Sequence, residues 1–120
     1  MCIRDSTIND NGTLANKQEY YYMHVPSNSL EGRLDGMCMS RDGWLVAATE
    51  LGVQICDQPG RVHLILPKPR LAKRVSYTAF GGKDWKTLYI ATGNQVYKRR
   101  TKLIGAQPWQ APVKPPRPRL

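Results

Sequence analysis

Two aspartates of this 120-residue chain, Asp35 and Asp42, each precede a glycine. A carboxylate can ligate a cation or take a proton as a general base, whereas an Asp-Gly pair is more often a tight turn. The turn interpretation fits Asp42, because Gly43 leads directly into an apolar run. Asp35 is therefore the first candidate for chemistry, and its role depends on the elements that position it.

The other polar side chains are weaker candidates. Glu50 and Asp57 lie where strand and turn geometry predicts solvated turn acids. His24 and His63 alternate with apolar neighbours, which favours half-exposed strand residues over metal ligands. Three cysteines lie far apart and lack any Cys-x-x-Cys or histidine-rich context, so they predict neither a disulfide framework nor a zinc site. They are Cys2, Cys38 and Cys56.

Short alternating or β-branched runs separated by turn dipeptides fill the middle of the chain. Almost nothing has helical spacing, so the pattern predicts an all-β fold. The clearest hairpin joins Gly36–Ser40 to Trp44–Thr49 through an Asp-Gly turn. Two further strands are expected at Gly52–Cys56 and Arg61–Leu66, before prolines end the series.

The strand pattern repeats along the chain. Leu45–Thr49 precedes Leu88–Thr92 by 43 residues, and at the same offset Val53 falls on Val96. A repeat of about 40 to 50 residues with four strands per unit is typical of β-propeller blades. The chain would then hold about one complete four-stranded blade and parts of two others, with residues 7–26 ending the preceding blade.

In this arrangement Asp35 precedes the innermost strand of the complete blade. Innermost strands line the central channel of a propeller, so the carboxylate can point at an ion held there. The repeat partner of Asp35 at the 43-residue offset is Thr78, which is not an acid. An acid in one blade only favours a single off-symmetry site over a structural requirement of the repeat.

Five segments, taken in order, resemble a known family. They are Leu34–Gly43, Leu45–Thr49, Gly52–Gln54, Ala79–Gly82 and Thr87–Ile90. Together they resemble the C-terminal part of the senescence marker protein/gluconolactonase (regucalcin-like) family over residues 7–105. The resemblance implies a longer, six-bladed parent propeller with a divalent metal, calcium or zinc, at its channel. It also implies a hydrolase that acts on lactones or related esters.

The resemblance assigns a role to Asp35, since the Asp of the family's Asp-Gly-Met motif ligates the metal and serves as general base. The cation would polarise a lactone carbonyl and lower the pKa of a water, while the carboxylate takes its proton. The family's other ligands, a Glu and an Asn, would lie upstream of Thr7. The metal site is therefore expected to be incomplete in this chain, and the chain alone inactive. Tyr77 departs from the Asn that relatives often carry and would alter specificity if it faces the substrate.

Both ends of the chain depart from the family pattern. Residues 1–6 resemble no part of it and are interpreted as a non-native leader. Residues 106–120 form a Pro/Arg-rich tail, which we expect to lie over the propeller as an extended strap. Its segment Lys114–Arg119 could instead dock in an aromatic groove of a partner.

The net charge of +9 is unevenly distributed, with −4 in residues 1–60 and +13 in residues 61–120. Clustered Lys and Arg can bind nucleic acid, but here prolines interrupt them and no recognisable module contains them. We expect a small-molecule lactone as partner, no nucleic acid and no membrane, with the remaining blades outside this chain. A non-catalytic propeller that serves as a binding platform stays open as the alternative, and the compartment, cytoplasmic or periplasmic, stays open too.

Overall fold

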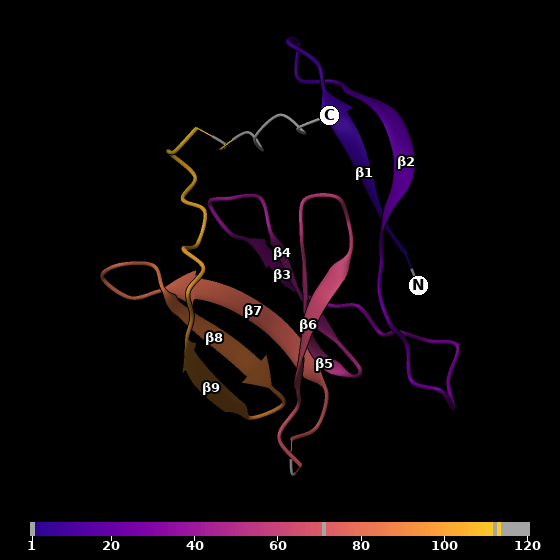
Figure 1. The fold of residues 1–120 in the computed structure, drawn as a ribbon, viewed down its shortest axis with the longest axis vertical. Helices are drawn as coiled ribbons and strands as arrows, with labels where there is room; N and C mark the ends of the chain where they lie inside the picture. Colours follow the sequence, from indigo (N-terminus) through magenta and orange to yellow (C-terminus); the bar gives the residue numbers. More distant parts are fainter. Residues whose placement is uncertain (1, 71, 112, 114–120) are drawn as a thin grey trace.

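The computed structural model describes residues 2–70, 72–111 and 113, which are arranged as Figure 1 shows. These residues form nine strands in three antiparallel sheets, so the predicted all-β fold is confirmed. Within them, no helix exists that could cross a membrane. The first sheet contains β1 (Cys2–Ile8) and β2 (Leu14–Tyr22). The central sheet contains β3 (Met37–Met39), β4 (Leu45–Thr49), β5 (Gly52–Cys56) and β6 (Val62–Pro67), and the third contains β7 (Val75–Gly81), β8 (Thr87–Thr92) and β9 (Gln95–Arg100).

The four strands of the central sheet pair in chain order, as the sequence predicts for one complete blade. Their first turn depends on Gly43, whose φ of 78° lies in the left-handed region and whose N–H donates to the Ser40 carbonyl at 3.0 Å. Glycine adopts this conformation without steric cost, which explains the Asp-Gly pair. β3 is shorter than predicted, and β4 to β6 agree with their predicted bounds to within one residue.

Two apolar clusters place the central sheet between its neighbours (Figure 1). One face packs against the third sheet, where Val75 and Leu88 are buried. The other face is covered by the first hairpin and the segment after it, through Ile3, Tyr21 and the buried Met23. The buried members contributed by the central sheet are Val46, Ala48, Val53, Ile55 and Leu66 on the first face and Leu45, Ala47 and Cys56 on the second.

The strand registers show how the two blades correspond. Met37 pairs with Ala47 in the central sheet, and Thr78 pairs with Ile90 in the third. Because β4 and β8 match at an offset of 43 residues, Met37 is equivalent to Thr78, 41 residues later. The expected partner of Asp35, Thr78, is therefore wrong, and Asp35 falls on Ser76. The cause is the β7–β8 connection, which is two residues longer than the β3–β4 connection.

The segment after β9 returns to the inner edge of the central sheet. Gly105 forms a bridge with Ser40, and the Ala106 N–H donates to the Met39 carbonyl at 2.9 Å. A Cβ at position 105 would collide with Phe80, so a glycine is needed for this close approach. The predicted tail spans residues 106–120, but its segment Lys114–Arg119 lies outside the described residues.

Candidate functional site

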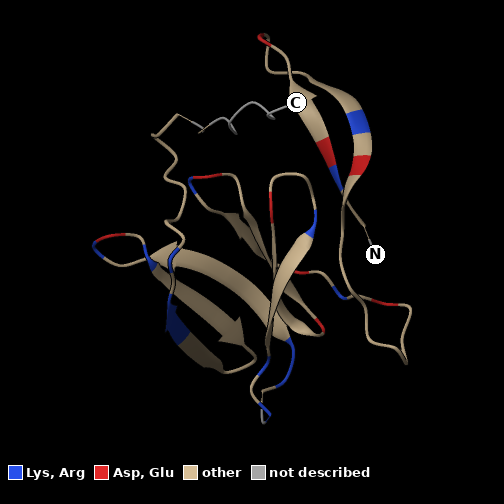
Figure 2. Cartoon of the chain, in the orientation of Figure 1, with Lys and Arg blue, Asp and Glu red and all other residues tan. Residues whose placement is uncertain are grey.

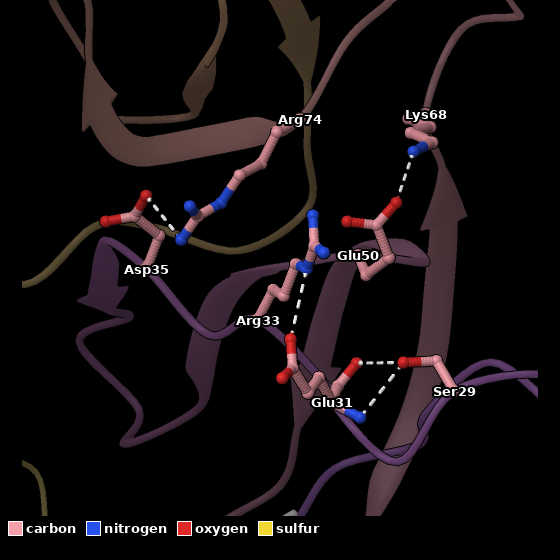
Figure 3. Close-up of polar contacts among 7 residues, drawn as sticks. All are labelled: Ser29, Glu31, Arg33, Asp35, Glu50, Lys68 and Arg74. Atoms are coloured by element: carbon pink, nitrogen blue, oxygen red, sulfur yellow. Dashed lines mark hydrogen bonds and ion pairs between the residues drawn. The ribbon is translucent and has the colours of Figure 1, made fainter.

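Asp35 lies two residues before the first residue of β3, which is an edge strand of the central sheet, and Figure 3 shows its side chain. Its backbone N–H donates to the Ala48 carbonyl at 3.0 Å, so pairing with β4 fixes its main chain. Its side chain is 43% exposed, and its Oδ2 lies 3.1 Å from Nη2 of Arg74. The backbone is thus held rigidly, while the carboxylate stays accessible and carries one ionic partner.

Gly36 joins the two inner strands beside this carboxylate. Its N–H donates to the Ser76 carbonyl at 2.9 Å, and its own carbonyl accepts the Ala48 N–H at 2.9 Å. The ring of Tyr77 lies so close that a Cβ on Gly36 would overlap it. The glycine after Asp35 therefore allows the neighbouring blade to place an aromatic ring against the site.

Figure 3 shows further charged side chains near Asp35. Glu50 follows β4, Lys68 follows β6, and Arg33 lies in the segment before β3. Glu50 accepts a hydrogen bond from Lys68 at 2.8 Å, and Arg33 pairs with Glu31 at 3.5 Å. The hydrogen bond from Lys68 lowers the pKa of Glu50, and the charges of Arg33 and Arg74 add to this effect. Glu50 is therefore a partly buried, paired carboxylate, which the expectation of a solvated turn acid did not anticipate.

Asp57 also differs from the expectation, because it is buried at 5% exposure. It lies at the opposite end of β5 from Glu50 and accepts hydrogen bonds from the Arg61 backbone at 2.8 Å and from His63 Nε2 at 2.7 Å. Burial raises the pKa of Asp57, but the hydrogen bonds from Arg61 and His63 outweigh it and lower the pKa overall. The ring of His63 lies 5.0 Å from that of Trp44. Asp57 thus holds the β5–β6 hairpin together.

The donor set determines whether this chain could hold a metal. Asp35 offers carboxylate oxygens, which both calcium and zinc accept. Within the described residues, no group of three or more His, Cys, Asp or Glu side chains could hold an ion. His24 is exposed and His63 is bound to Asp57, so neither contributes to a cluster with Asp35. Asp35 could serve as one ligand, and the described residues bring no such group of His, Cys, Asp or Glu side chains together with it.

Basic and acidic side chains are concentrated in different parts of the fold (Figure 2). Lys and Arg gather on β9 and on the connection from β6 to β7, while acids lie mostly on turns and on the first hairpin. Arg74 belongs to this basic connection and reaches back to Asp35. The basic second half of the sequence therefore contributes a positively charged side chain, Arg74, to the candidate site.

Sequence reasoning missed two residues that shape the site, Arg74 and Gln54. Arg74 could have been found from the repeat, because it lies 41 residues after Arg33, at the same offset that relates Met37 to Thr78. Gln54 is the one polar side chain of β5, all of which is buried. It bonds both backbone groups of His24, and a lone buried polar residue in an apolar strand is the signal for such a clasp.

Comparison with solved structures identifies the fold of this chain. A solved X-ray structure provisionally described as a gluconolactonase matches with a TM-score of 0.74 at 21% sequence identity. The match covers 88% of this chain and 33% of that one, so the chain spans about a third of the length of its structural relative. The four-stranded sheet is therefore one blade of a β-propeller and the other two sheets are parts of blades, which confirms the predicted propeller fragment.

The family model described as the SMP-30/Gluconolactonase/LRE-like region matches residues 2–94. The match includes residues 2–6, which were expected to resemble no part of the family and which here begin β1. The chain belongs to this family, as the motifs around Asp35 and Gly52 predicted. No curated protein matches the chain.

Proposed function

We propose that this chain is the C-terminal part of a metal-dependent lactone hydrolase. One observation carries the proposal. In a chain of the gluconolactonase family, Asp35 presents an accessible carboxylate from a backbone position fixed at the innermost strand. We propose Asp35 as both a metal ligand and the general base, with the remaining ligands supplied by blades outside this chain. A bound calcium or zinc ion would supply polarisation of the lactone carbonyl and a lowered pKa for a nearby water.

The proposed role of Asp35 is a proton transfer. As a water attacks the lactone carbonyl carbon, the carboxylate accepts the proton that the water loses. When the ring C–O bond breaks, the leaving alkoxide takes a proton back, and the product is an open-chain hydroxy acid. A rigid main chain favours this chemistry, because the base must lie within hydrogen-bond reach of the water.

Arg74 constrains the resting state of the proposed site. Its guanidinium lies 3.1 Å from one Asp35 oxygen, so a cation at that oxygen must displace it or share the carboxylate. Both side chains are close to half exposed, and an ion pair in such a setting contributes only about 0.2–1 kcal/mol. Arg74 can therefore pair with the carboxylate without blocking a multidentate metal site.

The proposal is tested on the whole propeller that contains this segment, by lactone hydrolysis and by calcium and zinc titration. Asp35→Asn keeps a neutral oxygen of the same shape but removes the proton acceptor and the charge. The expected loss in rate is about a hundredfold to ten-thousandfold, with weaker cation binding. Asp42→Asn is the matched control, because Asp42 lies in an exposed turn where asparagine also fits.

The alternative is a propeller that binds without catalysis. This alternative is kept because the described residues supply only one candidate metal ligand, Asp35. If Asp35→Asn equals the parent in both hydrolysis and cation binding, the site assignment is wrong and the binding platform replaces it. We propose a small-molecule lactone as the partner, and neither nucleic acid nor a membrane.

A further inference from the structure

A hollow of about 380 Å³ lies between the two inner strands, β3 and β7. Its walls are mostly apolar, with Met39 from β3 and Tyr77, Ala79 and Phe80 from β7, and with Trp85 from the β7–β8 turn. Ala106 and Pro108 bound it on the side where the chain returns from β9. The hollow and Asp35 lie along the same pair of inner strands, with Asp35 before the start of β3 and the hollow toward the end of β3.

Tyr77 connects this hollow to Asp35. A bulge in β7 between Val75 and Tyr77 shifts the register there, and bulges re-aim side chains. The ring lies against Gly36, the residue bonded to Asp35, yet 56% of Tyr77 remains exposed. The ring thus contacts the backbone next to Asp35 and also lines the hollow.

Trp85 forms the far wall and is held in an unusual conformation. Its φ of 55° lies in the left-handed region, which bulky residues rarely adopt and which costs free energy. Its N–H donates to the Gly82 carbonyl at 3.1 Å, its carbonyl accepts from Gly105 at 2.8 Å, and its ring meets Trp109 edge-on at 6.0 Å. The surrounding contacts therefore hold a second aromatic residue in the lining of the hollow.

The polar atoms at the base of the hollow already have partners. The buried Thr78 hydroxyl donates to the Val46 carbonyl at 3.1 Å, and Cys38 Sγ lies 3.5 Å from it. A hydroxyl-rich ligand would leave its own groups unpaired here, at a cost that an apolar ring avoids. The chemistry of the walls therefore favours a flat apolar or aromatic group.

We propose that this hollow is a subsite for an aromatic or other flat apolar ring of the substrate, with Tyr77 as the residue that determines this specificity. The inference rests on the proposed function and names its substrate class, lactones that carry such a ring. Tyr77 binds the ring by stacking and takes no part in the proton transfer.

The test measures binding without catalysis on this chain. The probes are two hydrolytically inert lactams, 3,4-dihydro-2-quinolone with a fused aromatic ring and glucono-δ-lactam with hydroxyl groups. NMR titration of the labelled chain should show a saturable shift of the Trp85 indole N–H with the aromatic lactam only. Trp44, which does not line the hollow and whose ring lies 5.0 Å from that of His63, serves as the internal reference.

Three variants test the contribution of the Tyr77 ring. Tyr77→Ser should weaken binding of the aromatic lactam about two- to tenfold, the range expected for one aromatic stacking partner. Tyr89→Ser is the matched control, because Tyr89 is a comparably exposed tyrosine at 39% on β8, outside the hollow. Gly36→Ala should weaken binding by displacing the Tyr77 ring and should have no further effect when combined with Tyr77→Ser.

Three results would overturn the subsite: no saturable shift at Trp85, binding of the sugar lactam as tight as that of the aromatic one, or an unchanged affinity in Tyr77→Ser. Failure of the proposed function has a different signature. If the whole propeller hydrolyses no lactone while the aromatic lactam still binds through Tyr77, the hollow stands as a ring-binding site and the hydrolase assignment falls.

Discussion

Gln54 provides a stringent test of how the blade holds the segment that leads to Asp35. Its side chain is fully buried in β5. The Oε1 atom accepts the His24 N–H at 2.9 Å, and Nε2 donates to the His24 carbonyl at 2.8 Å and to Thr49 Oγ1 at 3.0 Å. The Gln54 side chain thus satisfies both backbone groups of His24, as a neighbouring strand would do through its own backbone.

The expected cost of Gln54→Met follows from these three bonds. Methionine keeps the unbranched shape but makes none of them, and each is worth about 1 kcal/mol. His24 is exposed enough for water to replace part of the loss, and Thr49 keeps its own bond to the Gly52 carbonyl. We therefore expect the free energy of unfolding to fall by about 2 kcal/mol rather than about 3.

Urea denaturation measures this loss, and amide hydrogen exchange at His24 localises it, since that N–H should exchange faster. Gln95→Met is the matched control, because Gln95 is exposed on β9 and should change stability by less than about 0.5 kcal/mol. A change at Gln54 as small as at Gln95, with His24 exchange unaltered, would refute the clasp.

Three further predictions concern the site and the hairpin next to it. The purified 120-residue chain should show no lactone turnover with calcium or zinc, because it supplies one ligand; turnover that Asp35→Ala abolishes would contradict this. In the whole propeller, Arg74→Gln should tighten calcium binding by up to about fivefold in a calorimetric titration, while Arg33→Gln should not; equal effects of the two would contradict competition at Asp35. Because the pKa of Asp57 is depressed from 3.8, its stabilising contribution is present above about pH 4 and lost as the pH falls through the folded-state pKa. The loss of stability on acidification, measured by circular dichroism, should therefore be smaller in Asp57→Asn than in the parent.

The parts of the fold that local chemistry determines were predictable from the sequence. The turn at Gly43 needs a left-handed backbone, and the fully buried β4 and β5 appear as short apolar runs between turn residues. The repeat of Leu45–Thr49 in Leu88–Thr92 then indicated stacked blades, and the structure pairs both strands as the pattern requires.

The partners of the charged groups were not predictable, because they come from other blades or other strands. Arg74 reaches Asp35 across the blade interface, and Lys68 reaches Glu50 across 18 residues of sequence. Asp57 illustrates the same point, since an acid in a turn reads as solvated until two later side chains cover it. The offset that pairs Asp35 with Ser76 was missed because a longer turn between β7 and β8 is invisible to a fixed repeat length.

The register comparison also bears on why a propeller can carry chemistry in one blade only. At Asp35 the fold uses the backbone, through the N–H to Ala48 and the neighbouring Gly36, and the side chain contributes only a half-exposed ion pair. At the equivalent Ser76 the backbone carbonyl accepts the Gly36 N–H, and the side-chain hydroxyl donates to the Ala91 carbonyl. The blade interface therefore depends on main-chain atoms that any residue provides. A carboxylate can be placed at position 35 with little effect on the fold, which leaves this side chain available for the metal-binding role that we propose for it.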